Sequence, residues 1–91
     1  MIISFKCKRL KKFYRGDRSK IAPAHHVKVN LILQALASAT TVYDMDIPGF
    51  NLHSYVEFSP TRWSVDVSGN YRIHFEFVNG NAQNVDYMDP H

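Results

Sequence analysis

The last third of the chain alternates apolar with polar residues and is interrupted by two turn signals. Ser68-Gly69-Asn70 and Asn79-Gly80-Asn81 carry the glycine and asparagine residues that tight hairpin turns require. Successive side chains of a strand point to opposite faces of a sheet, so the three runs predict an antiparallel meander with one apolar face. That face would comprise Trp63, Val65, Val67, Tyr71, Ile73, Phe75, Phe77, Val85 and Tyr87.

The second face of this predicted meander is polar. Its residues are Arg62, Ser64, Asp66, Arg72, His74 and Glu76. Beyond the third strand the chain reads Asp89-Pro90-His91, so we expect an arginine, a carboxylate and a histidine to meet there.

A strand and a basic helix are predicted at the start of the chain. Met1–Phe5 is a short apolar run that suits a strand. Leu10, Phe13 and Tyr14 then recur at the spacing of one helical stripe. The rest of this helix is cationic, through Lys8, Arg9, Lys11, Lys12 and Arg15. Like charges this close repel one another, and a polyanionic partner would offset the repulsion.

Pro23 suits the first turn of a second helix, where its missing N–H is not needed. The helix should run to about Thr40, and the chain is uncharged from Val29 to Tyr43. Its apolar set is Val27, Leu31, Leu33, Leu36 and Ala39. We expect this helix to be the main cover of the sheet, with a partner-binding helix as the alternative.

Turn signals divide the middle of the chain. Ile47-Pro48-Gly49 separates the helices from the strands, an irregular apolar run over residues 51–58 predicts a further strand, and Ser59-Pro60 follows it. The order is therefore β-α-α-β-β-β-β. Residues 1–91 are expected to form one α+β domain, with two helices packed on one face of a mainly antiparallel, twisted sheet and the other face free.

The basic residues are concentrated at the front of the chain. Residues 1–28 hold nine of the eleven Lys and Arg residues and one of the eight acidic residues. Concentrated cationic charge attracts polyanions such as nucleic acid, although a solvated helix face is the ordinary explanation of such a run.

Cysteine content and hydropathy favour a cytoplasmic protein. The single cysteine, Cys7, excludes an internal disulfide and fits a reducing compartment. Neither a signal peptide nor a membrane span is predicted, because the apolar runs Met1–Phe5 and Val29–Ala39 are too short.

The polar face carries groups suited to metal-independent cleavage of RNA. In that reaction a base removes the proton of a 2′-hydroxyl, which attacks the adjacent phosphate. A cation stabilises the phosphoryl oxygens, and an acid protonates the leaving oxygen. Histidine titrates near neutral pH and arginine binds phosphate through a bidentate fork, so Arg72, His53 and the Asp89-Pro90-His91 ending are candidates.

Two polar-face residues also have purely structural interpretations. Arg72 could pair with Asp66 or Glu76 across the sheet, an ion pair that contributes little to stability. His74 could be an ordinary polar residue of its strand, without a role in function.

The other histidines have ordinary interpretations as well. His53 could cap a strand, and His91 could be an unattached end. His25 and His26 are adjacent and would point about 100° apart on a helix, so no metal site is expected. The sequence also contains no glycine-rich phosphate loop or nucleotide-binding fingerprint, and no cofactor is expected.

Four stretches of the chain resemble one family of bacterial toxins. They are ISFKCKRLKKFY, IPGFNLHSY, RWSVDV with GNYRIHFEFVNG, and VDYMDPH. The chain is similar over nearly its whole length to the HigB branch of the RelE/ParE superfamily, whose members are small β-α-α-β-β-β-β domains. The resemblance implies a ribosome-dependent endoribonuclease that cleaves messenger RNA during translation. It also implies neutralisation by a HigA-like helix-turn-helix antitoxin, through which alone the toxin would reach operator DNA.

The resemblance further implies roles for single residues. Arg72 stands at the arginine of the family's N-[WY]-R pattern and would hold the scissile phosphate. His53 matches the histidine of a leucine-histidine motif, while Asp89 and His91 match the acidic and histidine positions of the C-terminal motif. These three residues would share proton transfer. The residues that would contact ribosomal RNA are Lys8, Arg9, Lys11, Lys12 and Arg15.

Two positions depart from the family's pattern. Many relatives have a lysine three residues after the histidine, where this chain has Val56, and some end in Asp-Tyr-His, where this chain has Pro90. Arg62, close in sequence and on the polar side, is expected to replace the lysine and to contact RNA. Pro90 fixes its own φ and would hold His91 in place.

Two other functions stay open at the level of sequence. A non-enzymatic, ParE-like toxin that binds DNA gyrase would share the fold but lack the histidine-bearing ending. A basic RNA-binding module would need no catalytic group at all. Cleavage of messenger RNA separates the enzyme from both.

Overall fold

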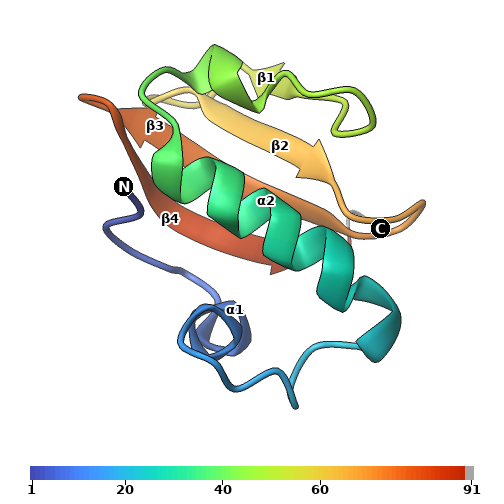
Figure 1. The fold of residues 1–91 in the computed structure, drawn as a ribbon. Coiled ribbons are helices and arrows are strands. Elements are labelled where there is room, and N and C mark those ends of the chain that lie inside the picture. Colours follow the sequence, from blue (N-terminus) through green and yellow to red (C-terminus); the bar gives the residue numbers. More distant parts are fainter. Residues whose placement is uncertain (90–91) are drawn as a thin grey trace.

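The computed structural model describes residues 1–89, and Figure 1 shows how they are arranged. The helices are α1, Lys8–Tyr14, and α2, His26–Ser38, and the 3₁₀ turns Pro23–His25 and Val42–Met45 flank α2. The strands are β1, His53–Tyr55; β2, Arg62–Asp66; β3, Arg72–Val78; and β4, Asn81–Met88. No helix in this part of the chain is long and apolar enough to cross a membrane.

The four strands form one antiparallel meander in the order β1-β2-β3-β4. Figure 1 shows α2 lying across one face of the sheet and α1 beyond the β4 edge. The predicted α+β fold, with two helices and a mainly antiparallel sheet, is confirmed. β1 is shorter than the strand predicted over residues 51–58, because the chain turns after Tyr55, whose carbonyl accepts the N–H of Phe58 at 3.3 Å.

The N-terminal segment does not form the continuous strand predicted for Met1–Phe5. It contacts β4 at two isolated parallel bridges, Ile2 with Ala82 and Phe5 with Val85. The sheet is therefore purely antiparallel within its four strands, and the N-terminal segment lies along its β4 edge.

A bulge in β4 explains why this edge contact is interrupted. The β3–β4 register shifts between His74 and Glu76, so that Phe75 faces two residues of β4, Asn84 and Val85. Asn84 has a φ of 52°, and its backbone N–H turns outward to donate to the Ser4 side chain at 2.8 Å. Because the bulge breaks the repeat of β4, the N-terminal segment pairs only on either side of it.

One face of the sheet is apolar and the other is polar, as the alternation of residues predicts. Val65, Ile73, Phe75 and Val85 are at most 1% exposed and form the core together with α2. The hairpin between β3 and β4 closes with a two-residue loop, Asn79-Gly80, in which both residues have positive φ. That conformation matches the right-handed twist of the strands and fixes their register.

The predicted core face of α2 is partly wrong. Leu33 and Leu36 are buried, but Val27 and Leu31 are 76% and 54% exposed. The buried stripe is Val29, Ile32, Leu33 and Leu36, which follows the i, i+3, i+4, i+7 spacing of one helix face. Val27 and Leu31 lie on the opposite side of the helix. The helix therefore carries more apolar residues than its contact with the sheet buries.

The burial of α2 predicts a difference between two leucines that are two residues apart. Leu33→Ala should lower the free energy of unfolding by about 2–5 kcal/mol, because it opens a cavity in the core. Leu31→Ala makes the same chemical change on the exposed side and should stay within about 0.5 kcal/mol of the unmodified protein. Urea unfolding of both variants measures the difference, and equal losses would contradict the orientation of α2.

Candidate active site

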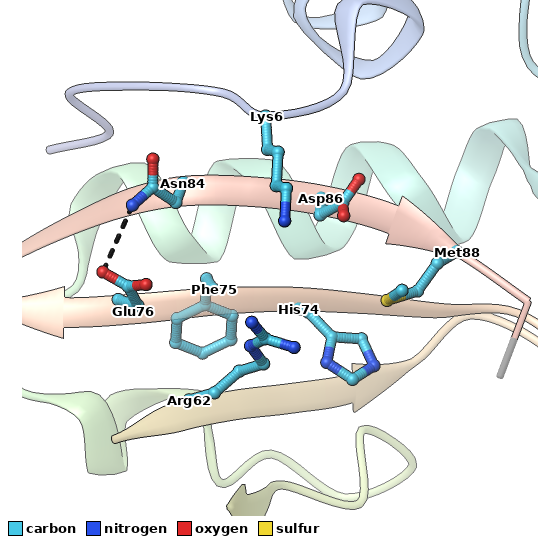
Figure 2. A pocket seen from close by; sticks show the side chains of 8 residues that line it. All are labelled: Lys6, Arg62, His74, Phe75, Glu76, Asn84, Asp86 and Met88. Carbon is cyan, nitrogen blue, oxygen red and sulfur yellow. Dashed lines mark hydrogen bonds between the residues drawn. The ribbon is translucent and has the colours of Figure 1, made fainter. Parts of the chain in front are cut away.

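The face of the sheet opposite α2 carries polar side chains in cross-strand rows. The register aligns Asp66 of β2 with Arg72 of β3, and Arg72 with Met88 of β4. The next row holds His53, Ser64, His74 and Asp86. Figure 2 views this face with α2 behind the sheet. The predicted polar face is confirmed, and it is the surface on which the candidate residues are displayed.

The Arg72 guanidinium is held in a defined position but keeps N–H groups that these contacts do not use. Its Nε lies 3.2 Å from Asp66 Oδ1, and its Nη1 donates to the Tyr55 hydroxyl at 3.3 Å. The ion pair with Asp66 that the sequence suggested is therefore present. A guanidinium has five N–H groups, so these two contacts leave others for a phosphate. The side chain is 37% exposed, which keeps it within reach of a ligand.

Tyr55 is the residue of this site that sequence reasoning missed. Its ring meets the His53 ring edge-on at 4.6 Å and stacks on the His74 ring at 5.4 Å. Its hydroxyl contacts both Arg72 and Ser64. Tyr55 thus joins three strands of the polar face. The available signal was its position two residues after His53, which places both side chains on the same face of β1.

His53 and Asp89 are related to Arg72 in different ways. His53 is exposed on β1 and contacts Tyr55, which in turn contacts Arg72. Asp89 is exposed and directly follows Met88, the β4 partner of Arg72. Pro90 and His91 lie outside the described residues, so the role of His91 stays a prediction.

His74 differs from an ordinary strand histidine. The residue is half-buried, and within the described chain neither ring nitrogen has a hydrogen-bond partner, although both are shielded from solvent. Burial, followed by the nearby Arg62, lowers the pKa of His74, while Asp86 acts in the opposite direction. The neutral ring is favoured, and it leaves one donor and one acceptor unused.

Five of the predicted RNA-contacting cations are exposed at α1. Lys8, Arg9, Lys11 and Lys12 lie on the helix, and Arg15 is the residue that caps its C-terminal end. Arg62 instead lies on the polar face, with its guanidinium 4.0 Å above the Phe58 ring. Val56 is 77% exposed in the turn after β1, and the replacement of the missing lysine by Arg62 stays a prediction.

The adjacent histidines at the start of α2 have separate structural partners. His25 Nδ1 bonds to the Tyr87 hydroxyl, and His26 Nε2 bonds to the Ile21 carbonyl at 2.8 Å. Burial, followed by the neighbouring Tyr71, raises the pKa of Tyr87, so its hydroxyl stays protonated near neutral pH. Within residues 1–89, no three His, Cys, Asp or Glu side chains come together as a metal-binding group.

Comparison with known proteins gives a consistent result. Residues 3–91 match the family described as RelE-like toxin of type II toxin-antitoxin system HigB. The chain is 36% identical over 92 positions to the endoribonuclease HigB of Proteus vulgaris, covering all of both chains. It is 35% identical over 95 positions to toxin HigB-1 of Vibrio cholerae serotype O1, covering all of this chain and 98% of the relative.

The environment of His74 predicts a pH dependence of stability. The pKa of His74 in the folded protein lies below the ordinary value of 6.5, so His74 binds a proton more readily in the unfolded chain than in the folded protein. Stability contributed by this site should be lost as the pH falls below about 6.5 toward the folded pKa. Urea unfolding at pH 7.5 and 5 should show a smaller acid loss for His74→Phe than for the unmodified protein. The same loss in both proteins would contradict a depressed pKa.

Proposed function

Because this chain belongs to the RelE-like HigB toxin family of type II toxin–antitoxin systems, we propose that it is a ribosome-dependent endoribonuclease that cuts messenger RNA during translation. The name of the Proteus vulgaris relative supports the endoribonuclease assignment. One structural observation supports it most. Arg72 stands on the uncovered face of the sheet, and its β4 partner Met88 directly precedes Asp89.

The proposed reaction needs no metal. A base takes the proton of the 2′-hydroxyl, the 2′-oxygen bonds to the adjacent phosphorus, and the bond to the 5′-oxygen breaks. The products are a 2′,3′-cyclic phosphate and a 5′-hydroxyl, which receives its proton from an acid. Charge builds up on the phosphoryl oxygens before that bond breaks, so a fixed cation lowers the barrier.

Arg72 supplies that cation. Asp66 and the Tyr55 hydroxyl hold its guanidinium in place before substrate binds, so little of the binding energy is spent on ordering the side chain. His91, Asp89 and His53 share the proton transfers as base and acid. Tyr55 positions His53 and Arg72 relative to each other through its ring and its hydroxyl.

The basic helix α1 binds ribosomal RNA, together with Arg62. Its cations are exposed and have no acidic residue in the first helical turn to offset them. Counterion release from the RNA backbone would drive this contact and make it sensitive to salt. A helix-turn-helix antitoxin is the proposed inhibitor and the route to operator DNA, and the toxin acts in the cytoplasm.

Loss of the Arg72 guanidinium should abolish cleavage without unfolding the protein. Arg72→Ala should lower the cleavage rate about 100-fold or more, the usual effect of removing one charge-stabilising donor. The Arg72–Asp66 pair is partly exposed, so stability should fall by no more than about 1 kcal/mol. Primer extension on messenger RNA after induction measures the cuts, and urea unfolding measures the stability.

A matched variant controls for the loss of one positive charge. Arg18→Ala removes an exposed arginine that stacks over Phe13 and lies outside the site. It should cut like the unmodified protein. Full cleavage by Arg72→Ala would reject the proposed enzyme, and intact messenger RNA with damaged DNA in the unmodified protein would favour a gyrase-binding toxin.

His91 should matter to catalysis and not to folding. His91→Ala is expected to remove growth arrest and messenger RNA cuts, because it deletes a proton-transfer group. The free energy of unfolding should stay within about 0.5 kcal/mol of the unmodified protein. Salt-sensitive RNA binding with unchanged toxicity in this variant would instead indicate a binding module without catalysis.

A further inference from the structure

The Asp66 carboxylate contacts two side chains, one through each of its oxygens. Its Oδ1 lies 3.2 Å from Arg72 Nε, and its Oδ2 accepts a hydrogen bond from Asn51 Nδ2 at 2.8 Å. The terminal torsion of an aspartate is broad when nothing constrains it. A carboxylate bound at both oxygens keeps one orientation, so the Asn51 contact fixes the direction in which Asp66 presents Oδ1 to the arginine.

The segment that carries Asn51 is itself fixed by contacts with the core and with α2. Phe50 is buried, and its carbonyl accepts the backbone N–H of Asp66 at 2.7 Å. Lys28 of α2 donates to the Gly49 carbonyl at 2.9 Å. Asn51 has a φ of 50°, in the left-handed region that asparagine adopts more readily than most residues. Phe50 and Asn51 therefore hold both the backbone and the side chain of Asp66.

The orientation of Asp66 decides which side of the Arg72 guanidinium remains for substrate. Asp66 contacts Nε, and the Tyr55 hydroxyl accepts a hydrogen bond from Nη1 at 3.3 Å. The N–H groups of the guanidinium that these contacts do not use belong to Nη1 and Nη2. A phosphate can bind them as a bidentate fork, which requires the guanidinium plane to stay fixed. If Asp66 turned, the plane would turn with it, and the phosphate would lose its alignment.

We infer that Asn51 is a positioning residue for the cleavage reaction and that it acts on Arg72 through Asp66. Its amide contributes to the rate by keeping the guanidinium aligned with the phosphoryl oxygens, on which charge builds up. The Asn51–Asp66 hydrogen bond is exposed, so its loss should leave the protein folded. This inference rests on the proposed endoribonuclease function, in which Arg72 stabilises the charge of the phosphate.

The test uses the full-length protein and purified ribosomes that carry one defined messenger RNA. It measures the maximal rate of cleavage and the ribosome concentration that gives half of that rate. Asn51→Gly removes the amide, and glycine keeps the positive φ without strain. Asn51→Asp keeps the size of the side chain but cannot donate a hydrogen bond near neutral pH. Asn79→Gly is the matched control, because Asn79 has a φ of 54° and lies in the turn beyond the other end of β3.

Both Asn51 variants should lower the maximal rate about ten-fold, less than the roughly 100-fold loss expected when the guanidinium itself is removed. The half-saturating ribosome concentration should change by no more than about two-fold, because the exposed cations of α1 are untouched. Asn79→Gly should cleave like the unmodified protein. Thermal unfolding checks that each variant is folded, and Asn51→Asp carries the test if Asn51→Gly does not fold. An unchanged maximal rate in a folded Asn51 variant would overturn the inference.

A second background separates positioning from a general loosening of the loop. Asp66→Ala removes the carboxylate through which Asn51 acts and should itself slow cleavage. In that background Asn51→Gly should lower the maximal rate by less than about two-fold, since two residues that act through one contact do not have additive effects. A further loss of about ten-fold would show that Asn51 acts independently of Asp66 and would overturn the inference. So would an Asp66→Ala variant that cleaves at the full rate.

The outcomes also separate this inference from the proposed function. Absence of messenger RNA cutting by the unmodified protein would overturn the proposed function, and this inference with it. Normal cutting by the unmodified protein, loss of cutting in Arg72→Ala and full cutting in Asn51→Gly would overturn the inference alone.

Discussion

The structure depends on the pairing of β3 with β2 in one register and with β4 on either side of one bulge. Alternate side chains of this strand point to opposite faces, so Ile73 and Phe75 enter the core while Arg72 and His74 face outward. A slip of one residue would exchange the two sets and place charge against α2. The Asn79-Gly80 turn and the bulge at Asn84 together fix the register with β4, and the same pairing therefore builds the core and displays the candidate site.

The polar face is organised around Tyr55 and is not a collection of separate surface charges. Its ring and hydroxyl reach His53, His74 and Arg72, residues of β1 and β3, two strands that β2 separates. Such contacts hold the Arg72 guanidinium in place and cover one face of the His74 ring. Both ring nitrogens of His74 are buried without a hydrogen-bond partner within residues 1–89, which costs stability at this position.

Sequence reasoning found the candidate residues whose chemistry is unusual for a sheet surface, but not those whose role depends on packing. Arg72, His53 and Asp89 stand out because cations, histidines and a terminal carboxylate suit phosphate chemistry. Tyr55 was included in the apolar run over residues 51–58. The alternation of residues does not reveal that its side chain contacts residues of neighbouring strands. His74 was interpreted as ordinary, because burial of its two nitrogens depends on neighbours from β1, β2 and β4.

The sequence by itself determined the order of the elements from α1 to β4, the two hairpin turns and the division of the sheet into an apolar and a polar face. These follow from local periodicity and from the backbone preferences of Gly and Asn. Only the tertiary structure decided which stripe of α2 is buried, and that Leu31 is not part of it. It also decided that the N-terminal segment pairs on either side of the Asn84 bulge. The physical reason is that burial and edge pairing depend on the shape of the partner surface, which local sequence does not encode.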